Sequence, residues 1–160
     1  MYFYAGDLER AQQLYRDAIE LTPEDYRIWG GLGDALHGLG AGEAATAAYM
    51  RAIELSLSAL DVNPVDQLTR AAMAHYLART GRLEEAADAI DIASLASPGH
   101  MDIRYYEALV RMDQGKVDQA LVAIGEPLAH EAEVVDGVVV ATGTVGQHDG
   151  VGRDRRLGQA

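Results

Sequence analysis

The histidines of this chain are the residues most able to bind a metal or move a proton, and their spacing is the first test of both. His130 and Glu131 begin like the zinc-binding helix motif, but no second histidine follows four residues after the first. The other histidines, at positions 37, 75, 100 and 148, also lack the spacing of metal ligands. The sequence therefore predicts no metal site.

The glycines, the acidic residues and the absence of cysteine also argue against catalysis. Gly30, Gly31 and Gly33 have neither a preceding strand nor the following Lys-Ser/Thr of a phosphate-binding loop, so we interpret them as sites of close helix packing. Acids such as Glu84 and Asp88 fall on one solvated helix face. The absence of cysteine excludes thiol catalysis, disulfides and thiolate ligands. We expect no enzymatic activity and no cofactor.

The charge of the chain restricts its partners. The formal net charge is −12, and all of the excess negative charge precedes residue 137, because the last residues carry three arginines and two aspartates. An acidic surface argues against nucleic acid and against an anionic membrane surface, and it permits a basic peptide or protein partner. No stretch is apolar enough to span a bilayer, and residues 1–10 do not have the pattern of a secretory signal, so we expect a cytoplasmic protein.

A repeated pattern of small residues must position whatever site the chain has. Gly6, Gly40, Gly81 and Gly115 lie 34, 41 and 34 residues apart, and alanine recurs five residues after each of them. A fixed period of this size is typical of stacked helical hairpins, in which each unit buries its apolar face against its neighbours. The alanines allow the two helices of a hairpin to approach closely.

Glycine and proline divide the pattern into helices. Each recurring glycine ends one apolar-periodic segment and precedes another, as a glycine after a helix C-terminus does. Pro23, Pro64 and Pro98 end the second helix of a unit, because proline cannot continue it. The second unit has seven extra residues near 56–62, where Leu57 and Leu60 continue the apolar period. Seven residues are about two helical turns, so we predict a longer second helix, over 44–60.

These features together resemble a known family. The residues that carry the resemblance are Trp29, Leu32, Gly33, Leu36, Gly40, Ala45, Tyr49 and Ala52. They are similar to the motif of the tetratricopeptide repeat, and weaker matches follow in the next two units. The sequence of the segment DYRIWGGLGDAL also resembles the repeat segment attached to some bacterial kinases, nucleotide cyclases and winged-helix regulators.

The resemblance implies an all-α, right-handed solenoid over residues 1–126. We expect a partial unit over 1–25, complete units over 26–66 and 67–100, and a degenerate unit over 101–126. Residues 127–160 are rich in valine and glycine, so we expect a flexible tail, in which Val138–Val140 could form a short strand. Large residues such as Trp29 and Leu83 are assigned to the core. The other core assignments are Leu32, Tyr49, Ile53, Tyr76, Ile90 and Tyr106.

In this family the first helix of each unit lines a concave groove, and the resemblance transfers that role to matching positions here. The expected groove residues are Arg27, Asp34, His37, His75, Arg79, Tyr105, Leu109 and Met112. Tyr105, Leu109 and Met112 would serve as apolar anchors for an extended or helical peptide. His37 and His75 fall on the same groove, and we interpret both as exposed histidines.

Two functions are compatible with this pattern. The first is a protein-protein interaction scaffold that binds a peptide or protein in the groove, as the sensory or assembly arm of a bacterial signalling protein. The second is an oligomerisation module. In that case the half-repeat at residues 1–25 and the long helix over 44–60 would pack against another copy of the chain.

Overall fold

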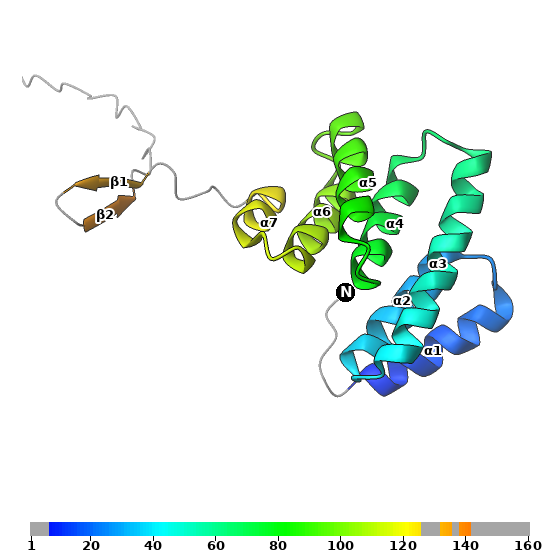
Figure 1. Cartoon of the computed structure of the whole chain (residues 1–160). Coiled ribbons are helices and arrows are strands. Elements are labelled where there is room, and N and C mark those ends of the chain that lie inside the picture. Colours follow the sequence, from blue (N-terminus) through cyan, green and yellow to red (C-terminus); the bar gives the residue numbers. More distant parts are fainter. Residues whose placement is uncertain (1–6, 126–131, 136–137, 142–160) are drawn as a thin grey trace, which may run out of the picture. The chain divides into compact units, whose positions relative to one another are not determined.

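The computed structural model describes residues 7–125, 132–135 and 138–141, and the chain divides into two compact units, residues 1–127 and 128–160. The helices described in the first unit follow one another without any intervening strand (Figure 1). They are α1 (Leu8–Leu21), α2 (Tyr26–Gly38), α3 (Gly42–Val62), α4 (Gln67–Arg79), α5 (Leu83–Ala96), α6 (Met101–Asp113) and α7 (Val117–Ala123).

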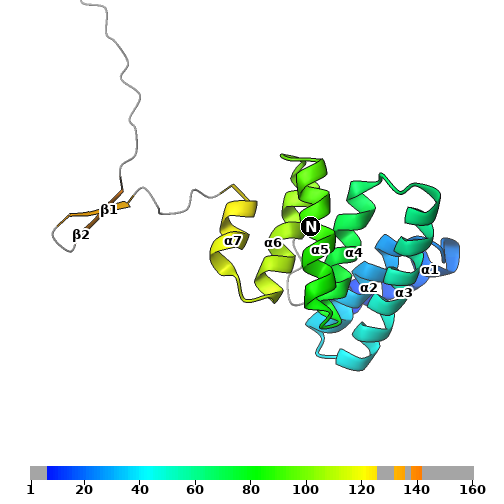
Figure 2. The ribbon, with the colours of Figure 1, turned by 45° about the horizontal axis from the view of Figure 1, so that its top comes forward.

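The helices form consecutive hairpins. In the two views, α2 lies beside α3, α4 beside α5 and α6 beside α7, and each hairpin packs against the next through α3 with α4 and through α5 with α6 (Figures 1 and 2). Helix α1 packs on α2 as the second helix of a preceding unit would. The predicted all-α solenoid is confirmed for the first unit.

The second unit contains a two-stranded antiparallel ladder. Strand β1 (Ala132–Val135) pairs with β2 (Val138–Ala141), so that Val135 lies opposite Val138. The valine run expected to form a short strand is thus part of β2. Most of the tail expected to be flexible lies outside the described residues, so that expectation stays a prediction.

Recurring glycines end the first helix of each hairpin, because each adopts a left-handed conformation. Gly40 has a φ of 75°, and the N–H of Ala41 after it donates to the carbonyl of Leu36 at 2.9 Å. Gly81 and Gly115 have φ values of 82° and 73°, and the residue after each makes the same bond. A residue with a Cβ would be strained at these positions, so their spacing sets the repeat length.

Prolines follow the second helices closely. Helices α1, α3 and α5 end at Leu21, Val62 and Ala96, each two residues before a proline. Proline disfavours the helical conformation of the residue before it, which accounts for these ends.

Helix α3 is the longest element, with 21 residues against 14 in the equivalent α5. Its additional turns lie toward the C-terminal end, where Ser56 and Leu60 are buried and Leu57 is half-exposed. The buried hydroxyl of Ser56 is satisfied by donating to the carbonyl of Ala52 at 2.8 Å.

Small and aromatic residues make up the core between the helices. The most completely buried alanines include Ala45, Ala52, Ala86 and Ala93. Most of the assigned core residues are buried, including Tyr49 and Ile90. The assignment of Leu83 was wrong, because it lies at the exposed first turn of α5. Trp29 is half-buried, and its indole N–H donates to the carbonyl of Pro23 at 2.9 Å.

None of the helices in the described part of the chain combines the length and the apolar character that crossing a membrane requires.

Candidate functional site

The first helices of the three hairpins, α2, α4 and α6, line one groove with a volume of about 570 Å³. Most of the residues expected in the groove line it; they are Arg27, Asp34, His37, His75, Arg79, Tyr105 and Leu109. Met112 does not line the groove and is exposed on α6 instead. The groove is therefore built from residues that lie far apart in the sequence.

Aspartate caps fix where two of these helices begin. The side chain of Asp25 accepts the backbone N–H of Arg27 at 2.9 Å, and Asp66 accepts those of Leu68 and Thr69, each at 3.1 Å. Such caps satisfy backbone donors that the first turn leaves unpaired. The pKa of each aspartate is lowered, mainly by the Arg27 side chain at Asp25 and by the Thr69 N–H at Asp66.

Three glycines of α2 let tyrosine rings lie directly on the helix. A Cβ added at any of them would overlap a tyrosine ring, so only glycine fits there. The pairs are Gly30 with Tyr76, Gly31 with Tyr15, and Gly33 with Tyr49. The interpretation of these glycines as close-packing sites is confirmed. This packing brings the rings of α1 and α4 to the wall of the groove.

A hydrogen-bonded cluster of Asp34, Tyr49 and His75 lies in the wall of the groove. Oδ1 of Asp34 accepts the Tyr49 hydroxyl at 2.7 Å and lies 3.1 Å from Nε2 of His75. Burial alone would raise the pKa of Asp34, but His75, Tyr49 and the charge of Arg79 together lower it. Burial and the neighbouring Asp34 raise the pKa of Tyr49, so this tyrosine remains a neutral donor.

The expectation that His75 is exposed was wrong. The residue is only 2% exposed, because it is enclosed by tyrosine rings from three helices. The ring centroids of Tyr49, Tyr76 and Tyr106 lie 6.2, 5.7 and 6.1 Å from that of His75. His37 is exposed, as expected. The groove therefore presents one histidine to solvent and holds the other against a carboxylate.

A second polar pair crosses from α4 to α6. Nη1 of Arg79 lies 3.2 Å from Oδ1 of Asp113, and both side chains are largely buried. Within the described part of the chain, three buried polar atoms have no hydrogen-bond partner, and they belong to two groove residues and to Asp113, the partner of Arg79. These atoms are Nδ1 of His75, Nε of Arg79 and Oδ2 of Asp113. Buried polar atoms are usually paired, so the polar network of the groove is incomplete.

Several groove residues were not predicted from the sequence. Tyr15 belongs to a second helix, α1, which the family pattern does not assign to the groove. Tyr76 and Tyr106 were assigned to the core only, yet both also line the groove. A smaller hollow of about 240 Å³ is lined by Tyr26 and shares Asp102, among other residues, with the groove. The sequence signal that could have indicated these groove residues was the number of tyrosines, 8 in the chain.

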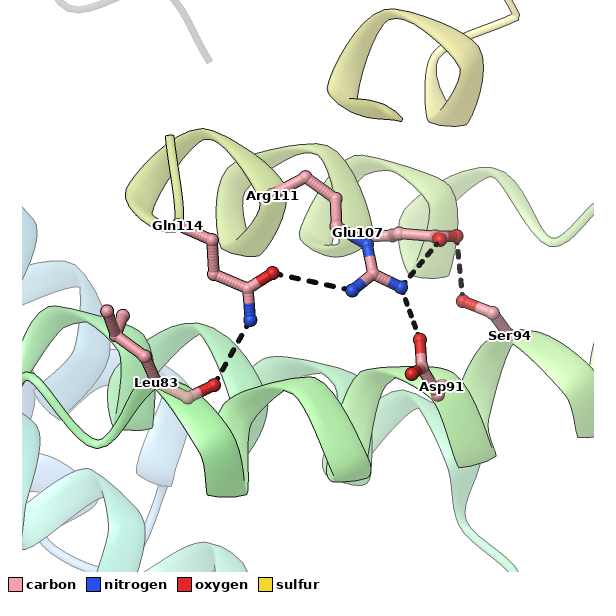
Figure 3. Close-up of polar contacts among 6 residues, drawn as sticks. All are labelled: Leu83, Asp91, Ser94, Glu107, Arg111 and Gln114. Atoms are coloured by element: carbon pink, nitrogen blue, oxygen red, sulfur yellow. Dashed lines mark hydrogen bonds and ion pairs between the residues drawn. The ribbon is translucent and has the colours of Figure 1, made fainter. Parts of the chain in front are cut away.

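Another polar cluster joins α5 to α6, and its bonding is complete at its centre (Figure 3). Arg111 of α6 is 8% exposed and forms ion pairs with Asp91 of α5 and with Glu107, one turn earlier on α6. Glu107 also accepts the hydroxyl of Ser94 at 2.8 Å, and the Gln114 amide donates to a carbonyl of α5 at 3.1 Å. This cluster does not line the groove.

Comparison with known families assigns the architecture. The family model described as tetratricopeptide repeat matches residues 2–59 and 71–132, which is most of the chain. This chain belongs to the tetratricopeptide repeat family. No curated protein matches it significantly. Tetratricopeptide repeats are generally non-catalytic and mediate protein-protein interaction. The interval between the two matches includes the C-terminal end of the long α3, where this tetratricopeptide solenoid departs from the usual repeat length.

Proposed function

We propose that this tetratricopeptide solenoid is an interaction scaffold that binds a peptide segment of a partner protein in the groove of α2, α4 and α6. The observation that carries the proposal is the groove itself, in which three successive hairpins contribute side chains to one hollow of about 570 Å³. A hollow of this size can accept several side chains of an extended or helical peptide.

The chemistry of the groove supports binding rather than catalysis. Burial raises the pKa of Tyr76 well above its ordinary value and that of Tyr106 to about 12, so both hydroxyl groups are neutral. Tyr105, which is 58% exposed, offers a ring face and a hydroxyl group to a partner, and these are typical contacts of binding surfaces. As a finer proposal, the scaffold is the sensory or assembly arm of a cytoplasmic bacterial signalling protein, on the basis of the resemblance described above.

Site-specific photo-crosslinking tests this function. A benzoylphenylalanine placed at Tyr105, which is 58% exposed and lines the groove, would contact a bound partner directly. The matched control is the same photo-crosslinker at Ile92, which is 51% exposed on α5 and lies outside the groove. We expect the Tyr105 position, and not the Ile92 position, to give a covalent adduct with one partner in native cells.

The adduct is then mapped by mass spectrometry. A single peptide of another protein joined to the Tyr105 position supports the proposal. Equal labelling from both positions, or none from either, contradicts it, because a partner in the groove must approach one surface and not the other.

Self-association is the second candidate, and exposed apolar residues on α3 favour it. Leu57 is half-exposed and Val62 is almost fully exposed, whereas Leu60 is buried within the chain and cannot contribute. Light scattering over a wide concentration range separates the two functions. A constant monomer mass removes self-association, and a Leu57→Ser variant that restores the monomer would support it.

A further inference from the structure

The charged groups that line the groove differ in whether they already have a partner. Arg27 is held by Asp25, with Nη2 and Oδ2 2.7 Å apart, and Arg79 is held by Asp113. A carboxylate of this chain therefore offsets each arginine, strongly at the largely buried Arg79 and weakly at Arg27, whose side chain is 69% exposed. An acidic ligand would have to compete with those pairs, which argues against a negatively charged segment.

Two carboxylates that line the groove form no ion pair with an arginine or lysine within the described part of the chain. There, Asp34 of α2 is bonded only through Oδ1, to Tyr49 and His75, and its side chain is 43% exposed. The charge of Arg79 helps to lower the pKa of Asp34, but Arg79 itself is paired with Asp113. Asp102, in the first turn of α6, is exposed and forms no ion pair within the described part of the chain. Two accessible carboxylates on different helices leave the groove with a negative charge that a ligand could balance.

Tyrosines line the same groove as these carboxylates; they are Tyr15, Tyr76, Tyr105 and Tyr106. One cation–π contact already lies beside the groove: the guanidinium of Arg27 is 5.9 Å from the centroid of the Tyr26 ring. A guanidinium stacks on an aromatic ring and pairs with a carboxylate at the same time, which an ammonium does less well.

We infer that the partner segment is basic and carries arginine, with guanidinium groups paired to Asp34 and Asp102 and stacked on the groove tyrosines. The inference rests on the proposed function, since it names the chemistry of the peptide that the groove binds. The net charge of −12 acts in the same direction, because a negative field raises the rate at which a basic segment arrives.

A set of three synthetic peptides tests this inference on the full chain. The probe is a short Ala/Gly peptide that carries two arginines. Its controls are the same peptide with two citrullines, which keep the shape without the charge, and with two glutamates. Binding is followed by NMR, through the ring protons of the tyrosines. We expect the arginine peptide to shift the tyrosine signals, with weak affinity, and neither control peptide to do so.

Two variants distinguish binding in the groove from nonspecific electrostatic attraction to an acidic protein. Asp102→Asn removes one groove carboxylate, and Asp88→Asn removes the charge of an exposed acid on α5, outside the groove. We expect Asp102→Asn to lower the affinity for the arginine peptide roughly threefold to tenfold. We expect Asp88→Asn to leave this affinity unchanged within error. Because Asp102 is exposed, folding of the variant should be preserved, and circular dichroism verifies it.

Three results would overturn the inference: equal weakening by the two variants, binding of the glutamate peptide as tightly as the arginine peptide, and no binding of the arginine peptide up to millimolar concentration. Failure of the proposed function is recognised separately, by the photo-crosslinking at Tyr105. A groove that crosslinks a non-basic segment keeps the function and loses this inference.

Discussion

Two polar clusters lie between the hairpins of this solenoid, and they differ in how completely they are bonded. Around Arg111, between α5 and α6, the guanidinium pairs with two carboxylates (Figure 3). Around Asp34 and His75, in the groove, bonds between side chains leave Nδ1 of His75 unpaired within the described part of the chain. The first cluster has the form of a structural junction, whereas the second combines incomplete bonding with an accessible carboxylate.

The comparison assigns different roles to the two clusters: the one around Arg111 holds hairpins together, and the one around Asp34 and His75 belongs to the binding groove. Residues that hold hairpins together can bury and pair their charges fully, since no ligand needs them. A binding surface must keep some polar groups available, and it loses stability as a result. The four predictions that follow test this difference in roles, from the largest expected effect to the smallest.

Replacement of Arg111 should have the largest effect on stability. Arg111→Met keeps the length of the side chain but leaves Asp91 and Glu107 without their shared cation. We expect a loss of about 2 kcal/mol, below the value for a fully buried pair because Asp91 is largely exposed. Urea denaturation measures it. Arg51→Met, which breaks the exposed pair with Glu54, is the control and should cost less than about 0.5 kcal/mol. Equal losses would show that the Arg111 cluster is not a junction.

Asp34 should make stability depend on pH. Its pKa is lowered in the folded chain, so its contribution is present above the ordinary carboxyl pKa and is lost as the pH falls through the lowered value. We expect Asp34→Asn to cost about 1 kcal/mol near neutral pH, after allowance for its partial exposure. The difference in melting temperature between wild type and variant should begin to shrink as the pH falls below about 4, and it should disappear only below the lowered pKa of Asp34. A difference that stays constant through this range would contradict the assignment.

Replacement of His75 should cost little, in contrast to Arg111. His75→Leu fills a similar volume and removes an imidazole with an unpaired nitrogen, while Asp34 keeps its bond to Tyr49. We expect a change of less than about 1 kcal/mol in either direction, measured by the same urea titration. A loss as large as that of Arg111→Met would mean that the groove cluster is also a structural junction.

Asp102→Asn should have the smallest effect on stability. The residue is exposed and has no cation partner within the described part of the chain, so we expect a change within about 0.5 kcal/mol. Its effect on binding of the arginine peptide should be much clearer. A melting temperature lowered as far as that of the Arg111 variant would contradict the view that Asp102 is kept for binding.

The arrangement of helices was predictable because it depends on local requirements. A glycine with positive φ, such as Gly40, and a proline two residues after a helix each constrain the backbone in their own vicinity. The extra length of α3 was also predictable, since seven residues keep the apolar face on the same side.

The groove was only partly predictable. The family pattern brought together most of its residues, because the first helix of each unit presents the same positions. It did not include Tyr15, and it treated His75 as exposed although the side chain is buried. Both differences arise from neighbours in other helices: Gly31 admits the ring of Tyr15, and three tyrosines enclose His75.

The sequence by itself determined the period, the helix ends and the tetratricopeptide family, because each follows from the backbone preferences and sizes of single residues at regular intervals. Only the tertiary structure decided which charges are paired. Asp34 meets His75 across 41 positions of sequence, and Arg79 meets Asp113 across the α4–α6 contact. Such contacts between side chains depend on the angle and separation at which hairpins stack, and the packing of whole helices sets both.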